Sequence, residues 1–250
     1  MIRNRLIKAS VAVAALSAAV WGLWAFTSAP RSEAGGAKDN FTEFNSEFWK
    51  KTDGYSNGDM FNCTWRENNI SFAGDDLMTL SLTSRSPGEF DGAEYRSLEK
   101  YSYGKYEIRM KPAANPGVVS SFFTYTGPSE GEPWDEIDIE FLGKNTRQMQ
   151  LNYFTDGIGG HEKVIDLGFD ASEEFHWYSF DWKRDSITWY VDGRPVHTAT
   201  ESIPFTPGRI MMNLWNGTGV DSWLEAYDGT APLHAYYDEF RYTPAPARGK

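Results

Sequence analysis

Apolar and polar residues alternate in short segments from residue 38 to the end of the chain. Residues 77–83 alternate apolar and hydroxyl side chains, and residues 103–111 place Tyr106, Ile108 and Met110 on one face. A period of two is typical of half-buried strands, because successive side chains of a strand point to opposite faces. The same reasoning predicts further strands at residues 118–126, 136–142, 148–154, 177–182, 209–215 and 235–242.

Turn signals separate these segments. Asp192-Gly193 lies between the alternating residues 186–191 and 194–199, and this dipeptide favours the tight turn of a hairpin. No long stretch of the sequence has helical periodicity. Short strands at regular spacing with turns between them predict an all-β sandwich or barrel.

The length of 250 residues suits one all-β domain preceded by an export segment. A domain of this size buries a large core without disulfide bonds. We expect residues 44–243 to form the domain, residues 35–43 to be a linker, and residues 244–250, which are rich in Pro and Ala, to be a disordered tail.

Residues 1–34 have the order of an export signal. Arg3, Arg5 and Lys8 precede an uncharged run at residues 9–26, and small residues follow it. This order is typical of a secretory signal peptide. The uncharged run also reaches the lower limit of a membrane-spanning length, so an uncleaved N-terminal membrane anchor stays open. Both alternatives predict a secreted or otherwise extracytoplasmic domain.

Composition excludes several classes of partner and site. The net charge of −11 repels phosphate backbones, so we expect no nucleic acid partner. Cys63 is the only cysteine, which excludes an intramolecular disulfide. The four histidines show no ligand spacing, which argues against a catalytic zinc ion. Aromatic residues make up 16% of the chain; they fill a core, and they also suit a cleft for neutral sugars.

The most informative segment is residues 134–142. Glu136, Asp138 and Glu140 share one face of the predicted strand, and Ile137, Ile139 and Phe141 share the other. Three carboxylates in a row repel each other and destabilise the fold unless water or partners relieve them. An acidic face that protects a sheet edge is the alternative. The strongly apolar opposite face and a tryptophan on the carboxylate side favour a functional site.

Paired carboxyl groups at this spacing predict glycoside hydrolysis. That reaction needs one carboxyl group as an acid and another as a base or nucleophile, about 5–5.5 Å apart in a retaining enzyme. Glu136 and Glu140 can lean together on a concave sheet. The negative charge of Asp138 between them raises the pKa of a neighbouring glutamate, which keeps one carboxyl group protonated.

The segment resembles the E-I-D-I-E signature of glycoside hydrolase family 16, the retaining β-glucanases that include bacterial licheninases. The resemblance spans residues 44–242 and is carried by residues 61–65, 119–127, 134–144, 161–163, 167–171 and 211–221. It implies a jelly-roll, concanavalin-like β-sandwich with a substrate cleft on its concave sheet. It also implies endo-acting hydrolysis of β-1,4 bonds adjacent to β-1,3 bonds in mixed-linkage β-glucans such as lichenan and barley glucan.

The resemblance further implies roles for individual residues. Glu136 becomes the nucleophile, Glu140 the general acid/base, and Asp138 the electrostatic assistant. The substrate contacts carried over by position are Tyr55, Asn57, Glu94, Arg96, Tyr125, Trp134, Asn152, Asn213, Trp215 and Trp223. The chemistry requires no cofactor, the partner is the polysaccharide substrate, and we expect a monomer.

The family also binds a structural calcium ion, for which Asp238 matches the side-chain ligand. Three departures from the family pattern stand out. Gly92 occupies the position of a cysteine that often pairs with the equivalent of Cys63, so Cys63 is expected to be a free, buried thiol. Tyr95 replaces a smaller polar residue, and Phe154 stands where a tyrosine is usual.

Other activities remain open on the same residues. A transglycosylase shares the retaining chemistry, because a sugar hydroxyl can replace water in the second step. Laminarinase-type activity on a related glucan would use the same carboxylates. A non-catalytic carbohydrate-binding module would use the same concave sheet, although the presence of all three carboxylates argues against it.

Overall fold

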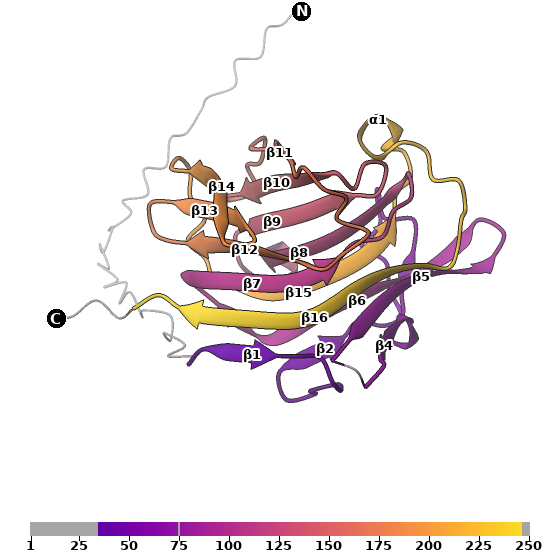
Figure 1. Cartoon of the computed structure of the whole chain (residues 1–250), viewed down its shortest axis with the longest axis horizontal. Helices are drawn as coiled ribbons and strands as arrows, with labels where there is room; N and C mark the ends of the chain where they lie inside the picture. The colour runs from indigo at the N-terminus through magenta and orange to yellow at the C-terminus, as the bar shows by residue number, and fades with distance from the viewer. Residues whose placement is uncertain (1–34, 75, 247–250) are drawn as a thin grey trace, which may run out of the picture. The chain divides into compact units, whose positions relative to one another are not determined.

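The computed structural model describes residues 35–74 and 76–246 (Figure 1). It is built almost wholly from strands, with one four-residue helix, α1, and two short 3-10 turns. The elements in chain order are β1 Ala37–Asp39, β2 Trp49–Lys51, β3 Thr64–Trp65, β4 Ile70–Phe72, β5 Met78–Ser86, β6 Glu89–Tyr101, β7 Gly104–Lys111, β8 Val118–Thr126, β9 Asp135–Leu142, β10 Gln148–Phe154, β11 Lys163–Asp166, β12 His176–Trp182, β13 Ile187–Val191, β14 Arg194–Ala199, β15 Gly208–Asn216, α1 Asp221–Leu224 and β16 Leu233–Pro244.

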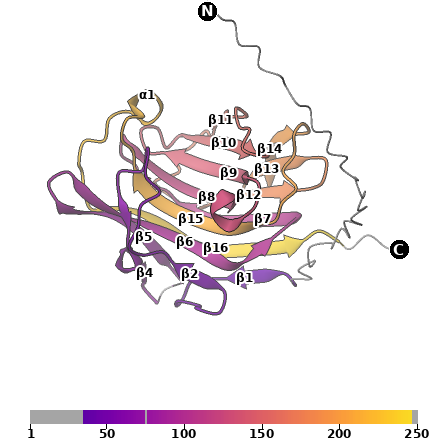
Figure 2. The same ribbon diagram turned by 180° about the vertical axis from the view of Figure 1, so that it is seen from behind.

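The strands form two packed layers, visible in Figures 1 and 2. One layer has the order β11-β10-β9-β8-β15-β6, with β2 beside β6. The other has the order β5-β16-β7-β12-β13-β14, with β1 beside β16 and β4 beside β5. Pairing of β5 with β6 joins the two layers. The expected all-β jelly-roll sandwich is therefore confirmed.

The alternation of β9 determines which of its faces lies in the core. Ile137, Ile139 and Phe141 are fully buried between the layers, which removes their apolar surface from water and stabilises the strand. Trp189 of the opposite layer donates its indole N–H to the carbonyl oxygen of Asp138, at 3.1 Å. The opposite layer thus bonds the backbone of β9 on its core face, at Asp138, the middle of the three carboxylate residues.

The linker expected at residues 35–43 is wrong. Ala37–Asp39 pairs with the end of β16, and the side chain of Phe41 is fully buried. The indole of Trp49 donates to Asp39 Oδ2 at 2.8 Å, so this segment is part of the sandwich. The polar sequence of this segment does not indicate a strand, because the strand forms only by pairing with β16, more than 190 residues away.

The disordered tail expected at residues 244–250 is wrong at its beginning. Strand β16 runs through Pro244, and the backbone N–H of Ala245 donates to the carbonyl oxygen of Tyr103. Residues 247–250 lie outside the described residues, as do residues 1–34 with the expected signal peptide or anchor. Between residues 35 and 246, apart from residue 75, no helix has the length and apolarity that crossing a bilayer requires.

Cys63 is a free, buried cysteine, as expected. Burial raises the pKa of its thiol to about 12, so the thiol stays protonated and unreactive at neutral pH. A Cβ atom built on Gly92 would lie 2.6 Å from Cys63 Sγ. The chain therefore keeps the close approach of these two positions without the second sulfur.

Candidate active site

Glu136, Asp138 and Glu140 lie on one face of β9, here called the carboxylate face. Antiparallel pairing places Phe154, Asn152 and Gln150 of β10 directly opposite these three residues, in that order. On the other side of β9, the partners from β8 are Tyr125, Phe123 and Ser121. Directly paired residues of neighbouring strands share a face, so each carboxylate lies in a row that crosses the sheet.

These rows continue across two more strands. Ser121 pairs with Asn213 of β15, which pairs with Glu94 of β6. In the row of Asp138, Phe123 pairs with Met211, which pairs with Arg96. The sheet register thus brings five of the expected substrate contacts onto the carboxylate face. They are Glu94, Arg96, Tyr125, Asn152 and Asn213.

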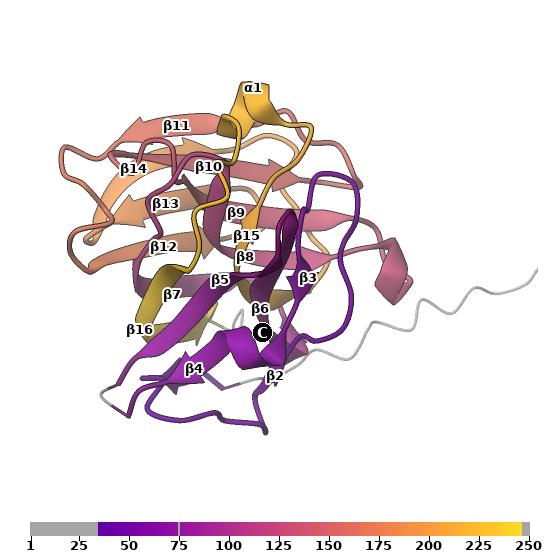
Figure 3. The ribbon, with the colours of Figure 1, turned by 90° about the vertical axis from the view of Figure 1, so that its right-hand side faces the viewer.

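Two aromatic pairs lie at the two ends of the carboxylate row. Trp134 stacks on Phe154, with 4.5 Å between ring centroids and 12° between planes, and its indole donates to Glu136 Oε2 at 2.5 Å. Beyond Glu140, the ring centroids of Trp215 and Trp223 lie 6.1 Å apart. Trp215 is only 2% exposed, whereas Trp223 is half-buried. Trp223 belongs to α1, which is labelled in Figure 3.

The loop before β3 brings Tyr55 to the same face. Its hydroxyl lies 3.5 Å from Glu94 Oε1, which also accepts a 2.8 Å hydrogen bond from Thr52. Asn57 accepts a 3.0 Å hydrogen bond from the indole of Trp65. Tyr55 is 43% exposed and is free to contact a ligand, whereas the side-chain oxygen of Asn57 already has a protein partner.

Burial raises the pKa of every carboxyl group in the row. For Glu136 the pKa rises to about 7, because burial and the charge of Glu140 outweigh the hydrogen bond from Trp134. For Glu140 it also rises to about 7, because burial and the charge of Glu162 outweigh the hydrogen bond from Gln150. The pKa of Asp138 lies well above its ordinary value through burial and both neighbouring glutamates. The row therefore holds protons at neutral pH, which suits acid–base chemistry.

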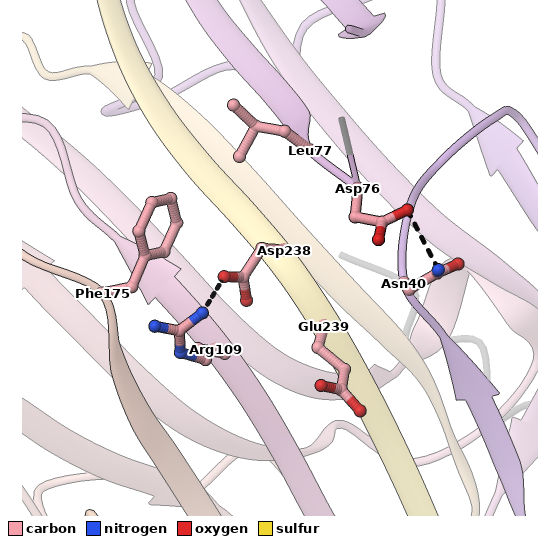
Figure 4. A pocket seen from close by; sticks show the side chains of 7 residues that line it. All are labelled: Asn40, Asp76, Leu77, Arg109, Phe175, Asp238 and Glu239. Carbon is pink, nitrogen blue, oxygen red and sulfur yellow. Dashed lines mark hydrogen bonds and ion pairs between the residues drawn. The ribbon is translucent and has the colours of Figure 1, made fainter. Parts of the chain in front are cut away.

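Asp238, the expected calcium ligand, lies in the other layer. It forms an ion pair with Arg109, and both residues line a hollow of ≈ 340 Å³ together with Asp76 and Glu239 (Figure 4). Among the described residues no group of three or more His, Cys, Asp or Glu side chains could hold a metal ion. One oxygen of Asp238, Oδ1, is buried and lacks a hydrogen-bond partner in the described part of the chain.

Three residues of this region were not predicted from the sequence. Gln150 donates to Glu140 Oε2 at 2.8 Å, and the charge of Glu162 acts on Glu140. Asp135 lies on the core side of β9 and accepts three backbone N–H bonds, from Asp156, Phe205 and Thr206. The period of two could have indicated Gln150, because it shares the parity of Asn152 on β10.

Comparison with known proteins agrees with this geometry. The model of the glycosyl hydrolases family 16 matches residues 57–232. The chain is 60% identical over 222 residues to a beta-glucanase of Bacillus subtilis, covering 88% of this chain and 92% of that protein. The solved Bacillus licheniformis beta-glucanase superimposes with a TM-score of 0.84 at 59% identity, covering 85% of this chain and 100% of that one.

A second solved structure is a prokaryotic beta-1,3-1,4-glucanase (lichenase) derived from a mouse hindgut metagenome. It superimposes with a TM-score of 0.82 at 52% identity, covering 84% of this chain and 100% of that one. These matches confirm the expected resemblance and the glycosidase class. The chain belongs to the glycosyl hydrolases family 16.

Proposed function

We propose that this protein is an endo-acting, retaining hydrolase of mixed-linkage β-glucan that cleaves β-1,4 bonds adjacent to β-1,3 bonds. The observation that carries the proposal is the row of three carboxyl groups on the carboxylate face. Asp138 is buried and the two glutamates are half-buried, and all three have raised pKa values. The similar protein from the mouse hindgut metagenome, named a beta-1,3-1,4-glucanase, supports the linkage.

In the proposed mechanism, Glu136 attacks the anomeric carbon while Glu140 protonates the departing oxygen, so that a glycosyl-enzyme forms. Glu140 then removes a proton from water, which releases the product with retained configuration. The indole bond from Trp134 to Glu136 favours the charged carboxylate needed for attack. The charge of Glu162 favours the protonated form of Glu140 needed in the first step. Asp138 between them has a raised pKa, and in its protonated form it assists by a hydrogen bond that favours the charged form of Glu136.

The substrate contacts follow from chemical type and position. Trp134 and Trp223 offer flat apolar faces on which the C–H face of a sugar ring can stack. Glu94, Arg96 and Asn213 offer groups that can bond sugar hydroxyls. Tyr55, Tyr125 and Asn152 complete the set along the same face. Trp215 is proposed to support it from a buried position, and Asn57 from an exposed position where its side-chain oxygen is bonded to the indole of Trp65.

The experiment is a comparison of products from mixed-linkage glucan, laminarin and cellulose. We expect rapid cleavage of mixed-linkage glucan alone, into short oligosaccharides that each end in a β-1,3 bond next to the reducing end. Glu136→Gln should abolish this cleavage with an unchanged circular dichroism spectrum. Rapid cleavage of laminarin would replace the proposal with a laminarinase-type activity. Binding to the glucan without product would favour a carbohydrate-binding module.

The balance between hydrolysis and transfer can be measured in the same assay. Adding oligosaccharide acceptors should leave hydrolysis products dominant. Longer products that increase with acceptor concentration would identify a transglycosylase, because an acceptor hydroxyl then replaces water in the second step.

We propose a structural calcium ion in the hollow of Asp238. Calcium prefers oxygen ligands. Oδ1 of Asp238 is buried and has no hydrogen-bond partner among the described residues, so it suits the one side-chain ligand that the family resemblance implies, with backbone carbonyl oxygens as the others. Calcium should raise the unfolding temperature of the wild-type protein relative to a chelator, and Asp238→Ala should remove the difference. Equal unfolding temperatures of the wild-type protein with calcium and with chelator would contradict the proposal.

We further propose that the domain acts outside the cytoplasm as a monomer. The basic, apolar and small-residue order of residues 1–34 supports export. Cell fractionation with N-terminal sequencing of the mature protein distinguishes a cleaved signal peptide from a retained anchor. Light scattering of the purified domain gives its oligomeric state.

A further inference from the structure

Gln150 makes two hydrogen bonds that join different parts of the site. Its Nε2 donates to Glu140 Oε2 at 2.8 Å, and its Oε1 accepts from the indole of Trp223 at 3.2 Å. Glu140 and Gln150 are directly opposite each other on β9 and β10, while Trp223 comes from α1. One amide therefore connects the proposed acid/base to a proposed sugar-stacking ring.

The chemistry of both partners fixes the direction of this amide. An indole nitrogen can only donate, so it must meet the amide oxygen, and the amide nitrogen is then left for the carboxyl group of Glu140. Gln150 is only 7% exposed, so water competes little for either bond. A rotation of the amide by 180° would lose both bonds at once.

The groups around Glu140 make this donor important. The charge of Glu162, on the segment that leads into β11, acts on Glu140, and Asp138 lies two residues away on β9 with Glu136 beyond it. None of the described residues forms a salt bridge with Glu140; the described Lys, Arg and His side chains that form such bridges contact other acids. The amide N–H of Gln150 is thus the favourable contact that the charged form of Glu140 receives from the neighbouring strand.

We propose that Gln150 is a positioning residue that holds Glu140 and couples it to the occupancy of the sugar site at Trp223. A sugar stacked on Trp223 fixes the indole, the indole fixes the amide, and the amide keeps the carboxyl group of Glu140 aimed and stabilised in its charged form. This inference rests on the proposed function, because it takes Glu140 as the acid/base. It adds a link between sugar binding and the protonation of that residue.

The coupling has a definite sign. Loss of the amide donor disfavours the charged form, so Glu140 keeps its proton to higher pH. The first chemical step needs protonated Glu140, so the basic limb of the profile of kcat/KM against pH should move upward. The second step needs charged Glu140 as a base, so kcat at neutral pH should fall.

The experiment compares three variants on mixed-linkage glucan across pH. Gln150→Leu removes both bonds and should move the basic limb upward by about one pH unit, the size expected for one bond to a charged group. Trp223→Phe keeps a flat ring but loses the indole donor, and should move the same limb by a smaller amount. Trp134→Phe is the matched control, because its indole bonds Glu136 and its loss should move the acidic limb instead.

An unchanged basic limb in Gln150→Leu, or equal effects of Trp223→Phe and Trp134→Phe on that limb, would overturn the inference. Thermal unfolding identifies a Gln150 variant that fails to fold, in which case Trp223→Phe decides, because Trp223 is not part of the buried core. Glu140→Gln distinguishes a failure of the proposed function from a failure of the coupling through Gln150. If it retains full activity, the proposed function fails; if it is inactive while the Gln150→Leu profile is unchanged, only the coupling fails.

Discussion

Two kinds of glutamate in this sandwich differ in the charge of the groups that bond them. Glu130 is bonded by Arg209 at 2.6 Å and Lys100 at 2.9 Å; burial raises its pKa, but the two cations outweigh burial and hold the pKa below its usual value. Glu136 and Glu140 have hydrogen-bond donors that are neutral, an indole and an amide. Their pKa values rise to about 7.

The difference shows how one fold keeps some carboxyl groups charged and others able to exchange protons. A cation nearby makes a carboxylate a stable structural charge. A neutral donor orients the carboxyl group without removing its proton affinity. Catalysis by paired carboxyl groups needs the second arrangement, because one member must donate a proton at neutral pH.

The largest expected effect is the loss of activity when a glutamate without a cationic neighbour, Glu136 or Glu140, is changed. Glu136→Gln and Glu140→Gln should each lower kcat/KM on mixed-linkage glucan by about 10⁴-fold, because each removes a group that takes part in bond making or proton transfer. Glu89→Gln is the control, since Glu89 is an exposed glutamate paired with Arg85. If Glu89→Gln lost as much activity as either active-site variant, glutamates paired with cations and glutamates with neutral donors would no longer differ in their effect on catalysis.

A smaller effect is expected from Asp135, which precedes Glu136 but faces the core. It is 2% exposed and accepts three backbone N–H bonds of 2.8–2.9 Å. Asp135→Ala leaves these buried donors unpaired and should lower the free energy of unfolding by about 3 kcal/mol. Asp135→Asn keeps one acceptor oxygen and should lose less. Urea denaturation measures both, and equal stability of Asp135→Ala and the wild-type protein would contradict the account.

The smallest effect is a pH-dependent change in stability with opposite signs in the two groups. The pKa of Glu140 is raised on folding, so charging this residue destabilises the folded state. The destabilisation is absent at pH 4 and complete above pH 7. Glu140→Gln should therefore stabilise the protein at pH 8, by about 1–2 kcal/mol, and have little effect at pH 4. Glu130 has a lowered pKa, so Glu130→Gln should destabilise at pH 8 and not at pH 3. Denaturation at these pH values would contradict the account if both variants changed stability in the same direction.

Sequence reasoning succeeded where a single strand carries its own signal. The alternation of residues 136–142 alone predicted both faces of β9, because an apolar face and a carboxylate face can be recognised within one strand without a distant partner. The hairpin at Asp192-Gly193 was similarly local, and the structure has β13 and β14 on either side of it.

Sequence reasoning failed where burial is polar or the partner is distant. Strand β6 was not predicted, although it is 13 residues long, because Glu94 is 2% exposed and interrupts the apolar period. Strand β1 looked like a linker because its pairing with β16 is not visible in three residues. The partner of Asp238, Arg109, and the two bonds of Gln150 depend on contacts between strands that no local pattern encodes.

In the proposed mechanism Glu136 attacks the sugar and Glu140 transfers the proton. The most direct test adds azide to Glu136→Ala and Glu140→Ala, with an aryl β-glycoside whose leaving group needs no proton, and determines the anomeric configuration of the glycosyl azide by NMR. Azide that replaces the nucleophile attacks the substrate once, so Glu136→Ala should give the α-azide. Azide that enters after a glycosyl-enzyme has formed inverts twice in total, so Glu140→Ala should give the β-azide. The reverse pattern would contradict the assigned roles.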